Sequence, residues 1–256
     1  MSISLCLVFI FLIMGCASQE KKLIEKVDVA AEQLRHLSSY KEMQCEVKLK
    51  FAEPTKSAWL QQIPKNNRYS LPGGGAKLFN TLEPQIYDWR ITPYRCRVTG
   101  RRTGELPEDV KLVLSDSEKK LDSILCIWMQ SFYADSPLRG WRKTEKKLEL
   151  DEIPNGVRIT KGYQRDLEIY NDGQQIVAHM GGDGSSLTGQ YQTLGDKLYP
   201  QMIEQKNQSQ ANRLQDFVYQ HQGGREIPSV FWLNLANEKG LPTAYFQVQV
   251  DSCQIR

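Results

Sequence analysis

The sequence predicts an α+β domain: a curved, half-barrel-like antiparallel sheet that is covered by a few helices and preceded by an amphipathic N-terminal helix. Three observations predict it. Apolar residues recur at three- and four-residue steps from Gln19 to Tyr40, the period changes to two in "QCEVKLKF" (44–51), and later segments alternate in the same way between turn-forming residues. Strands with one apolar face build antiparallel sheets, and that face must be covered by another layer.

An apolar leader precedes this domain. Leu5 to Met14 is an unbroken apolar run, and charged residues begin at Glu20. A helix of about 15 residues is roughly 22 Å long, which is shorter than the roughly 30 Å hydrocarbon core of a bilayer. The leader is therefore predicted to be a cleavable secretory segment and not a permanent membrane span.

The end of the leader has a specific form. Ile13-Met14-Gly15-Cys16 places an aliphatic residue at −3, Gly at −1 and Cys at +1, which resembles the bacterial lipoprotein signal, or lipobox. The resemblance implies a signal peptide over 1–15, a lipidated and acylated Cys16 as the mature N-terminus, and a tether over 16–22. The start departs from the pattern because it carries no Lys or Arg.

The resemblance also implies a location. Ala17 at +2, in place of Asp, is similar to the outer-membrane sorting signal of enterobacterial lipoproteins. Two or more acyl chains anchor a protein stably. We therefore expect a protein of the bacterial cell envelope that is held to the outer membrane through Cys16 and faces the periplasm or the cell surface.

Charge and cysteine usage narrow the function classes. The formal net charge of +3 is too small to predict a nucleic-acid partner, which needs a concentrated basic face. Four cysteines lie beyond the leader, an even number suited to an oxidising compartment. They are Cys45, Cys96, Cys126 and Cys253. Two disulfides, or one disulfide and two buried thiols, are both possible, and spacing does not choose among the three pairings.

The first half of the chain alternates between strands and helices. The first strand, 44–51, has one polar face. Further strands are expected at 57–63, 85–91 and 94–98, and "LPGGGAK" (71–77) is expected to be a turn or loop. A second helix is predicted over 117–134, where apolar residues form one stripe and Asp116 or Ser117 can cap the N-terminus.

The second half is predicted to consist mainly of hairpins. "LEIYNDGQQIVAH" (167–179) contains two β-rich runs joined by Asn171-Asp172-Gly173, and another strand follows over 185–194. Pro200 and the polar run 205–213 predict a connection that leads into a short helix near Ser209–Tyr219. The chain is expected to close with a hairpin around 237–240.

The order of these elements resembles the periplasmic lipoprotein-carrier family, the Lol-type half-barrel proteins. The resemblance lies in an amphipathic first helix that runs into an alternating strand, then successive strands, then an Ile-Pro lead into a terminal hairpin. It covers most of residues 23–256 and includes no diagnostic motif. It implies a single α+β domain that binds a lipid or an acyl chain in an apolar cavity, and no cofactor.

Catalytic and metal-binding motifs do not fit the chain. His36, His179 and His221 are far apart and form no H-E-x-x-H motif, and no C-x-x-C is present. Ser117 and Lys120 match S-x-x-K, but the companion S-D-N and K-T-G motifs are missing, so a helix cap followed by solvated lysines explains them. The sequence predicts a non-enzymatic protein without a metal or another cofactor.

Two basic clusters are candidate contacts with anions. The first surrounds Trp141 and consists of Arg139, Arg142, Lys143, Lys146 and Lys147. It suits lipid headgroups at a membrane interface, although a solvated strand edge is the preferred interpretation. The second flanks Cys96 and consists of Arg90, Arg95, Arg97, Arg101 and Arg102. Strand alternation sends Arg95 and Arg97 to one face, where ordinary exposure is preferred over an anionic partner.

The leading functional hypothesis is a lipid-anchored envelope protein that binds a lipid or acyl chain. The alternative is a scaffolding lipoprotein with a filled core that works through contacts with other envelope proteins. The aromatic residues of the expected strands serve either hypothesis, since they can line a cavity or fill a core. A hydrolase with an unrecognised site is a distant third.

Overall fold

A computed structural model describes a large part of the chain. The described residues are 3–52, 83, 85–92, 94–101, 122, 126, 137–138, 141, 148–160, 166–180, 184–207, 211–236 and 242–256. The expected strand at 57–63, the expected loop at 71–77 and all of the expected helix at 117–134 except Asp122 and Cys126 lie outside them.

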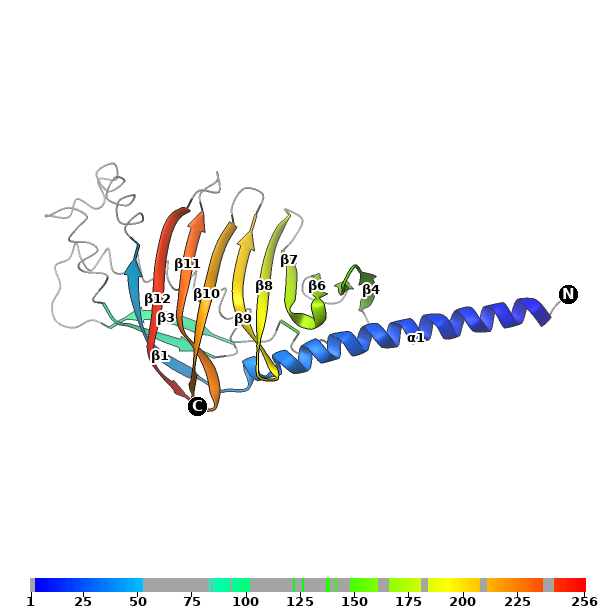
Figure 1. Cartoon of the computed structure of the whole chain (residues 1–256), viewed down its shortest axis with the longest axis horizontal. Coiled ribbons are helices and arrows are strands. Elements are labelled where there is room, and N and C mark those ends of the chain that lie inside the picture. Colours follow the sequence, from blue (N-terminus) through cyan, green and yellow to red (C-terminus); the bar gives the residue numbers. More distant parts are fainter. Residues whose placement is uncertain are drawn as a thin grey trace.

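One helix and twelve strands make up the described fold (Figure 1). The helix α1 spans Ile3–Leu34, with side chains described from Gln19 on, and continues as the 3-10 turn η1, Arg35–Ser38. The strands are β1 Met43–Phe51, β2 Tyr87–Ile91, β3 Cys96–Gly100, β4 Glu149–Ile153, β5 Gly156–Thr160, β6 Leu167–Tyr170, β7 Gln175–Met180, β8 Ser185–Leu194, β9 Lys197–Lys206, β10 Ala211–Gln222, β11 Arg225–Ala236 and β12 Pro242–Ile255.

The strands form one open antiparallel sheet in the order β3-β2-β1-β12-β11-β10-β9-β8-β7-β6-β5-β4. Because β1 pairs with β12, the first and last strands of the chain are neighbours inside the sheet. From β4 to β12 each strand pairs with the next one along the chain. The predicted antiparallel sheet with a leading helix is confirmed.

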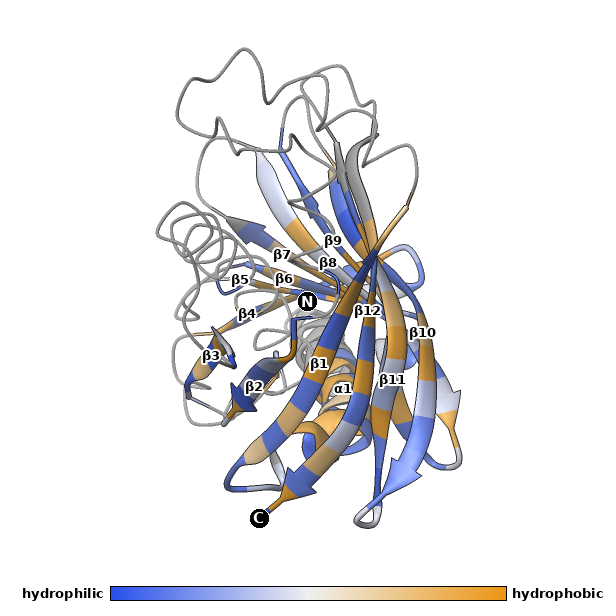
Figure 2. Cartoon of the chain, turned by 90° about the vertical axis from the view of Figure 1, so that its left-hand side faces the viewer, coloured by the Kyte–Doolittle hydropathy of each residue, from blue (hydrophilic) through white to orange (hydrophobic). Residues whose placement is uncertain are grey.

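The helix packs one stripe against the sheet, as its period predicts. Its stripe is buried at Leu23, Val27, Ala30 and Leu34, and Leu37 of η1 extends it. The main contacts are with β4, β5, β9 and η7, the 3-10 turn Asn171–Gly173 between β6 and β7. Figure 2 shows the sheet curving around this end of the helix.

Gly173 explains how closely the helix approaches the predicted hairpin. Its φ is +96°, and an added Cβ would lie 2.9 Å from the Cβ of Ala30. Any side chain there would strain the turn and push the helix away from the sheet. The expected hairpin over 167–179 is confirmed as β6 and β7, joined by η7.

Both disulfides form, which settles the pairing that the sequence left open. Cys45 and Cys253 are directly opposite each other on β1 and β12, with their Cα atoms 4.1 Å apart. Cys96 of β3 bonds to Cys126, which lies 30 residues later. The backbone N–H of Val98 also donates to the carboxylate of Asp122, so both described residues of the expected second helix lie beside β3.

Two expectations from the sequence are wrong. The short helix near Ser209–Tyr219 is instead strand β10, and Pro200 lies inside β9 and not in a connection. Asp216, with φ +57°, sits where the pairing of β10 with β11 shifts. Because of this irregularity, the buried Leu214 and Phe217 are three positions apart, a spacing that is typical of a helix and that explains the wrong prediction.

The hairpin β4–β5 was missed. β4 is the last strand of the sheet and is mostly exposed, so it has no alternating apolar pattern to detect. The terminal hairpin is confirmed as β11 and β12, which pair on either side of the turn expected at 237–240. Within the described residues, no helix combines the length and the apolar character needed to cross a membrane.

Candidate functional site

The sheet splits between β9 and β10. These strands pair only from Met202–Gln215 to Lys206–Ala211. Beyond that point β9 continues paired with β8, and β10 continues paired with β11. The irregularity at Asp216 turns β10 away from β9, and Pro200 is tolerated within β9 because its missing N–H lies where no β10 partner is present.

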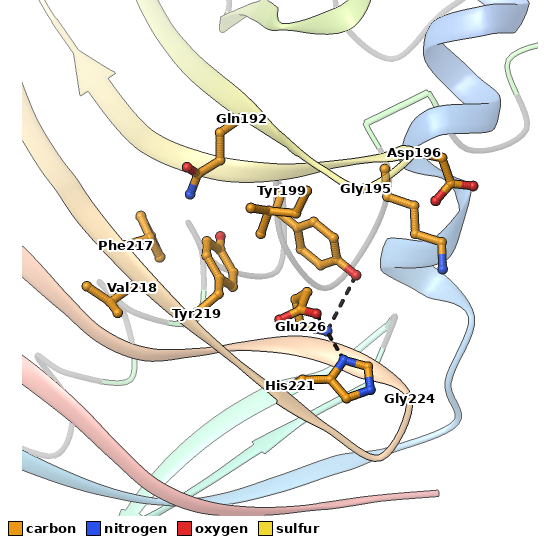
Figure 3. A pocket seen from close by; sticks show the side chains of 12 residues that line it. Gln192, Gly195, Asp196, Tyr199, Phe217, Val218, Tyr219, His221, Gly224 and Glu226 are labelled. Carbon is orange, nitrogen blue, oxygen red and sulfur yellow. Dashed lines mark hydrogen bonds and ion pairs between the residues drawn. The ribbon is translucent and has the colours of Figure 1, made fainter.

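A groove lies along the split, with a volume of about 620 Å³ (Figure 3). It is lined by Gln192, Leu194, Gly195, Asp196, Lys197, Tyr199, Phe217, Val218, Tyr219, His221, Gly224 and Glu226. The first six come from the hairpin β8–β9 and the other six from the hairpin β10–β11. The volume falls within the range of roughly 300–1,000 Å³ that is typical of small-ligand sites.

Aromatic rings form the apolar wall of the groove and lead toward the core. Tyr199 and Tyr219 have ring centroids 5.4 Å apart, and Tyr219 lies 6.1 Å from Phe217. Phe217 in turn stacks on the fully buried Phe231 at 5.0 Å. The ring of Phe231 lies 6.2 Å from that of Trp89 on β2. Phe217 therefore joins the rings of the groove to the buried aromatic residues of the core.

Polar and charged groups lie around these rings. His221 Nδ1 is 2.9 Å from the Glu226 carboxylate, and the backbone N–H of Glu226 points to the hydroxyl oxygen of Tyr199 at 3.5 Å. The hydroxyl of Tyr219 donates to the carbonyl of Pro200 across the split. Burial raises the pKa of Tyr199, which keeps its hydroxyl protonated near neutral pH. The groove thus combines aromatic surface with hydrogen-bonding and charged groups.

Side chains, and not sheet hydrogen bonds, hold the far end of the hairpin β10–β11. The pairing of β11 with β12 stops at Val230–Gln249, so the backbone of this end pairs with neither flanking strand. The buried Arg225 donates from Nη1 to the carbonyl of His36 at 2.8 Å and from Nη2 to that of Leu37 at 2.9 Å. Its guanidinium also lies over the ring of Tyr40, 4.4 Å from the centroid. Arg225 therefore ties one wall of the groove to the end of the helix.

His36 lies behind the groove, with its ring 4.4 Å from that of Tyr199. Burial lowers its pKa from 6.5 to about 4; the charge of Arg225 acts in the same direction, and the hydrogen bond to the carbonyl of Gln33 opposes it. The native protein therefore holds His36 neutral under conditions in which the unfolded chain protonates it.

We expect this histidine to make the protein acid-sensitive. The stability that neutral His36 contributes is complete above pH 6.5 and is lost as the pH falls from 6.5 to about 4. The free energy of unfolding should fall by on the order of 2 kcal/mol over this range, after allowance for partial exposure. Urea titrations between pH 7 and 4.5 measure this slope. His36→Gln should flatten it and His221→Gln, the exposed control, should not; equal slopes in all three proteins would contradict the assignment.

The other histidines have separate partners. His179 Nε2 is 3.3 Å from Glu168, which also accepts hydrogen bonds from Arg158 and Tyr170. Burial by itself would raise the pKa of Glu168, but the hydrogen bonds from Tyr170, Arg158 and His179 outweigh it and lower the pKa. Among the described residues, no group of three or more His, Cys, Asp or Glu side chains is arranged to hold a metal ion.

The groove and the residues singled out by sequence do not coincide. Cys16 lies within α1, in the part without described side chains, and Arg139, Arg142, Lys143 and Lys146 lie outside the described residues. Trp141, which these four surround, is only 4% exposed. The groove residues were missed because they gather only where the sheet splits; Pro200 inside an alternating run was the one signal of that split.

Comparisons of the chain with family models, with curated proteins and with solved structures give no match.

Proposed function

We propose that this chain is a non-enzymatic, lipid-anchored protein of the bacterial cell envelope, whose domain over 23–256 binds a lipid or acyl chain. The proposed ligand rests on one observation, the groove in the split between β9 and β10, whose aromatic lining contacts the buried core through Phe217. The sheet acts as a half-barrel, with α1 packed against it. The leader carries the anchor, at Cys16, and the outer membrane is the proposed location.

The composition of the groove favours an amphiphile. An acyl chain needs no reactive group, only apolar surface, and the rings of Tyr199, Phe217 and Tyr219 supply it. A polar headgroup needs hydrogen-bonding and charged partners, and Lys197, Glu226 and their neighbours at the same groove supply those. Since both kinds of surface line one groove, a molecule with an apolar and a polar end fits it better than a wholly apolar one.

The energy of binding sets a minimum length for the apolar chain. Burying one CH₂ group stabilises the complex by about 0.8 kcal/mol. Association costs about 4–15 kcal/mol in lost translational and rotational freedom. A chain of roughly ten or more carbons is needed to exceed a mid-range cost of about 8 kcal/mol. The ligand class is therefore long-chain lipids and not short fatty acids.

One mass measurement tests both the anchor and the ligand. The full chain is purified from a bacterial envelope in mild detergent and weighed under native and then denaturing conditions. We expect a covalent lipid mass that persists on denaturation and that Cys16→Ser abolishes, together with a second lipid mass that denaturation removes. A denatured mass without added lipid would overturn the anchor. A native mass without a removable adduct, after incubation with envelope lipids, would overturn the ligand.

A pair of neighbouring substitutions locates the ligand. Gln192 lines the groove, whereas Thr193, the next residue of β8, is exposed and does not line it. Gln192→Trp should fill the groove and lower the bound-lipid fraction by roughly tenfold or more, since every 1.4 kcal/mol of lost binding is tenfold. Thr193→Trp should leave that fraction unchanged. Equal adducts in both variants would place the ligand elsewhere.

A scaffolding role through protein contacts is the second candidate. The close ring contacts from Tyr199 to Trp89 favour it, because they fill this part of the domain with side chains and not with open space. A native mass without lipid, combined with recovery of the chain in an envelope protein complex after crosslinking, would support this role over lipid binding.

A further inference from the structure

The hairpin β2–β3 presents an exposed tyrosine among arginines at the end of the sheet. Tyr94, in the turn between the strands, is 76% exposed. Arg90, Arg95 and Arg97 are exposed as well, whereas Trp89, Ile91 and Val98 of the same strands are buried. One face of the hairpin therefore packs on the core, and the other is basic with an aromatic residue at its turn.

Two of these arginines face each other across the strands. Arg90 and Arg97 are directly opposite in the β2–β3 register. Like charges at such a position repel and weaken the pair. Arg90 has only a distant carboxylate, with its Nε 3.9 Å from Glu42, and no ion pair is recorded for Arg95 or Arg97 among the described residues. The hairpin therefore carries a local excess of positive charge that an external anion would relieve.

Arg101, which follows β3 directly, is an arginine whose charge is neutralised by carboxylates within the fold. Its guanidinium lies 2.6 Å from Glu46 and 2.5 Å from Asp88. The contrast is local: the arginine next to the base of the hairpin is neutralised by two close carboxylates, whereas Arg90 has one carboxylate at 3.9 Å and Arg95 and Arg97 have no ion pair with a described residue. Ion pairing among the described residues thus does not account for Arg95 and Arg97, and accounts for Arg90 only through its long contact with Glu42.

The hairpin is built rigidly enough to present this surface. The hydroxyl of Thr92 accepts hydrogen bonds from the backbone N–H groups of Tyr94 and Arg95, and closes the turn. At the start of β3, Cys96 is tied to Cys126 by a disulfide and accepts a hydrogen bond from the indole of Trp89. The backbone that carries the arginines and Tyr94 is therefore fixed before any partner arrives, which lowers the entropic cost of binding.

We propose that the hairpin β2–β3 docks on an anionic membrane surface, with lipid phosphates bound by Arg90, Arg95 and Arg97 and with Tyr94 at the headgroup level. Guanidinium groups bind phosphate oxygens with charge-assisted hydrogen bonds. A tyrosine has an apolar ring and a polar hydroxyl, and suits the boundary between headgroups and acyl chains. This aromatic residue at the exposed turn favours a lipid surface over an acidic protein. The contact is separate from the groove and needs no ligand there.

The test reports on the hairpin itself. Tyr94→Trp is introduced into the full chain, which is reconstituted in vesicles of phosphatidylcholine alone or with about a third phosphatidylglycerol, and brominated lipid serves as the quencher. The signal is the increase in tryptophan quenching in Tyr94→Trp over the quenching in the parent protein, which has five tryptophans of its own. We expect quenching in the anionic vesicles, little in the neutral ones, and a strong loss between 0.1 and 1 M salt as the Debye length falls from about 10 Å to about 3 Å.

Matched variants separate specific docking from general charge. Arg95→Gln combined with Arg97→Gln should lower the membrane-contacting fraction by roughly tenfold or more. Lys50→Gln combined with Lys206→Gln removes the same charge from exposed sites on other strands and should leave it unchanged. Quenching that is equal in both lipids, or unaffected by the arginine variant, would overturn the proposal. Absence of quenching in either lipid would also overturn it, and would point to an acidic protein instead.

Discussion

Removal of the Cys45–Cys253 disulfide is expected to lower the free energy of unfolding by about 5 kcal/mol. The bond joins residues 208 apart, so breaking it releases nearly the whole domain in the unfolded chain. Cys96 and Cys126 are only 30 residues apart, and their bond should contribute roughly 3.5 kcal/mol. The difference follows from loop length, because a longer closed loop restricts the unfolded chain more.

Guanidinium denaturation of the two double variants, Cys45→Ala with Cys253→Ala and Cys96→Ala with Cys126→Ala, measures both values. The free energy of unfolding of the parent protein under strong reductant should equal that of a variant in which the four disulfide-bonded cysteines are replaced. A loss smaller for the Cys45–Cys253 variant than for the other would contradict the loop-length argument. Such a result would mean that β1 and β12 stay paired in the denatured state.

Replacement of Arg225 by Leu is expected to lower the free energy of unfolding by about 3 kcal/mol. The guanidinium is buried and donates to the carbonyls of His36 and Leu37. Without it, these carbonyls lose a charged donor where the helix ends. The far end of the hairpin β10–β11 also loses its attachment, so the same variant should weaken the lipid binding that we propose for the groove.

Arg213→Leu is the matched control for this prediction. Arg213 lies on β10 and pairs with Glu204 on β9, but its side chain is about half exposed. An exposed ion pair contributes at most about 1 kcal/mol. The loss of stability in Arg225→Lys should lie between the losses in these two variants, because lysine keeps the charge but cannot donate to two carbonyls in the same bidentate geometry. Equal losses in Arg225→Leu and Arg213→Leu, measured in urea, would contradict the role assigned to Arg225.

The two predictions concern the same region of the molecule. Arg225 binds the carbonyls that end the helix, and Gln222, three residues earlier, donates to the carbonyl of Cys253 at 2.6 Å. One wall of the groove therefore depends on the helix and on the disulfide-bonded strand β12 for its position. A loss of either support is expected to change the groove before the rest of the sheet unfolds.

Local pattern was enough to predict most elements whose apolar face is regular. The four-three spacing from Leu23 to Leu37 predicted the helix, and the alternation over 44–51 predicted β1. The Asn171-Asp172-Gly173 turn predicted the β6–β7 hairpin. Prediction failed at β10, where the irregularity at Asp216 breaks the alternation, and at β4, whose exposed position leaves no apolar face to read.

Local patterns in the chain specify the leading helix, the alternating strands and the even set of cysteines beyond the leader. These features depend on residues within a few positions of one another, where spacing and residue type carry the information. Three features emerge only when the chain is folded: Cys45 pairs with Cys253, β9 and β10 separate to form a groove, and Arg90 faces Arg97. Each of these depends on strand order and register, which are set by the burial of one shared core and not by any local pattern.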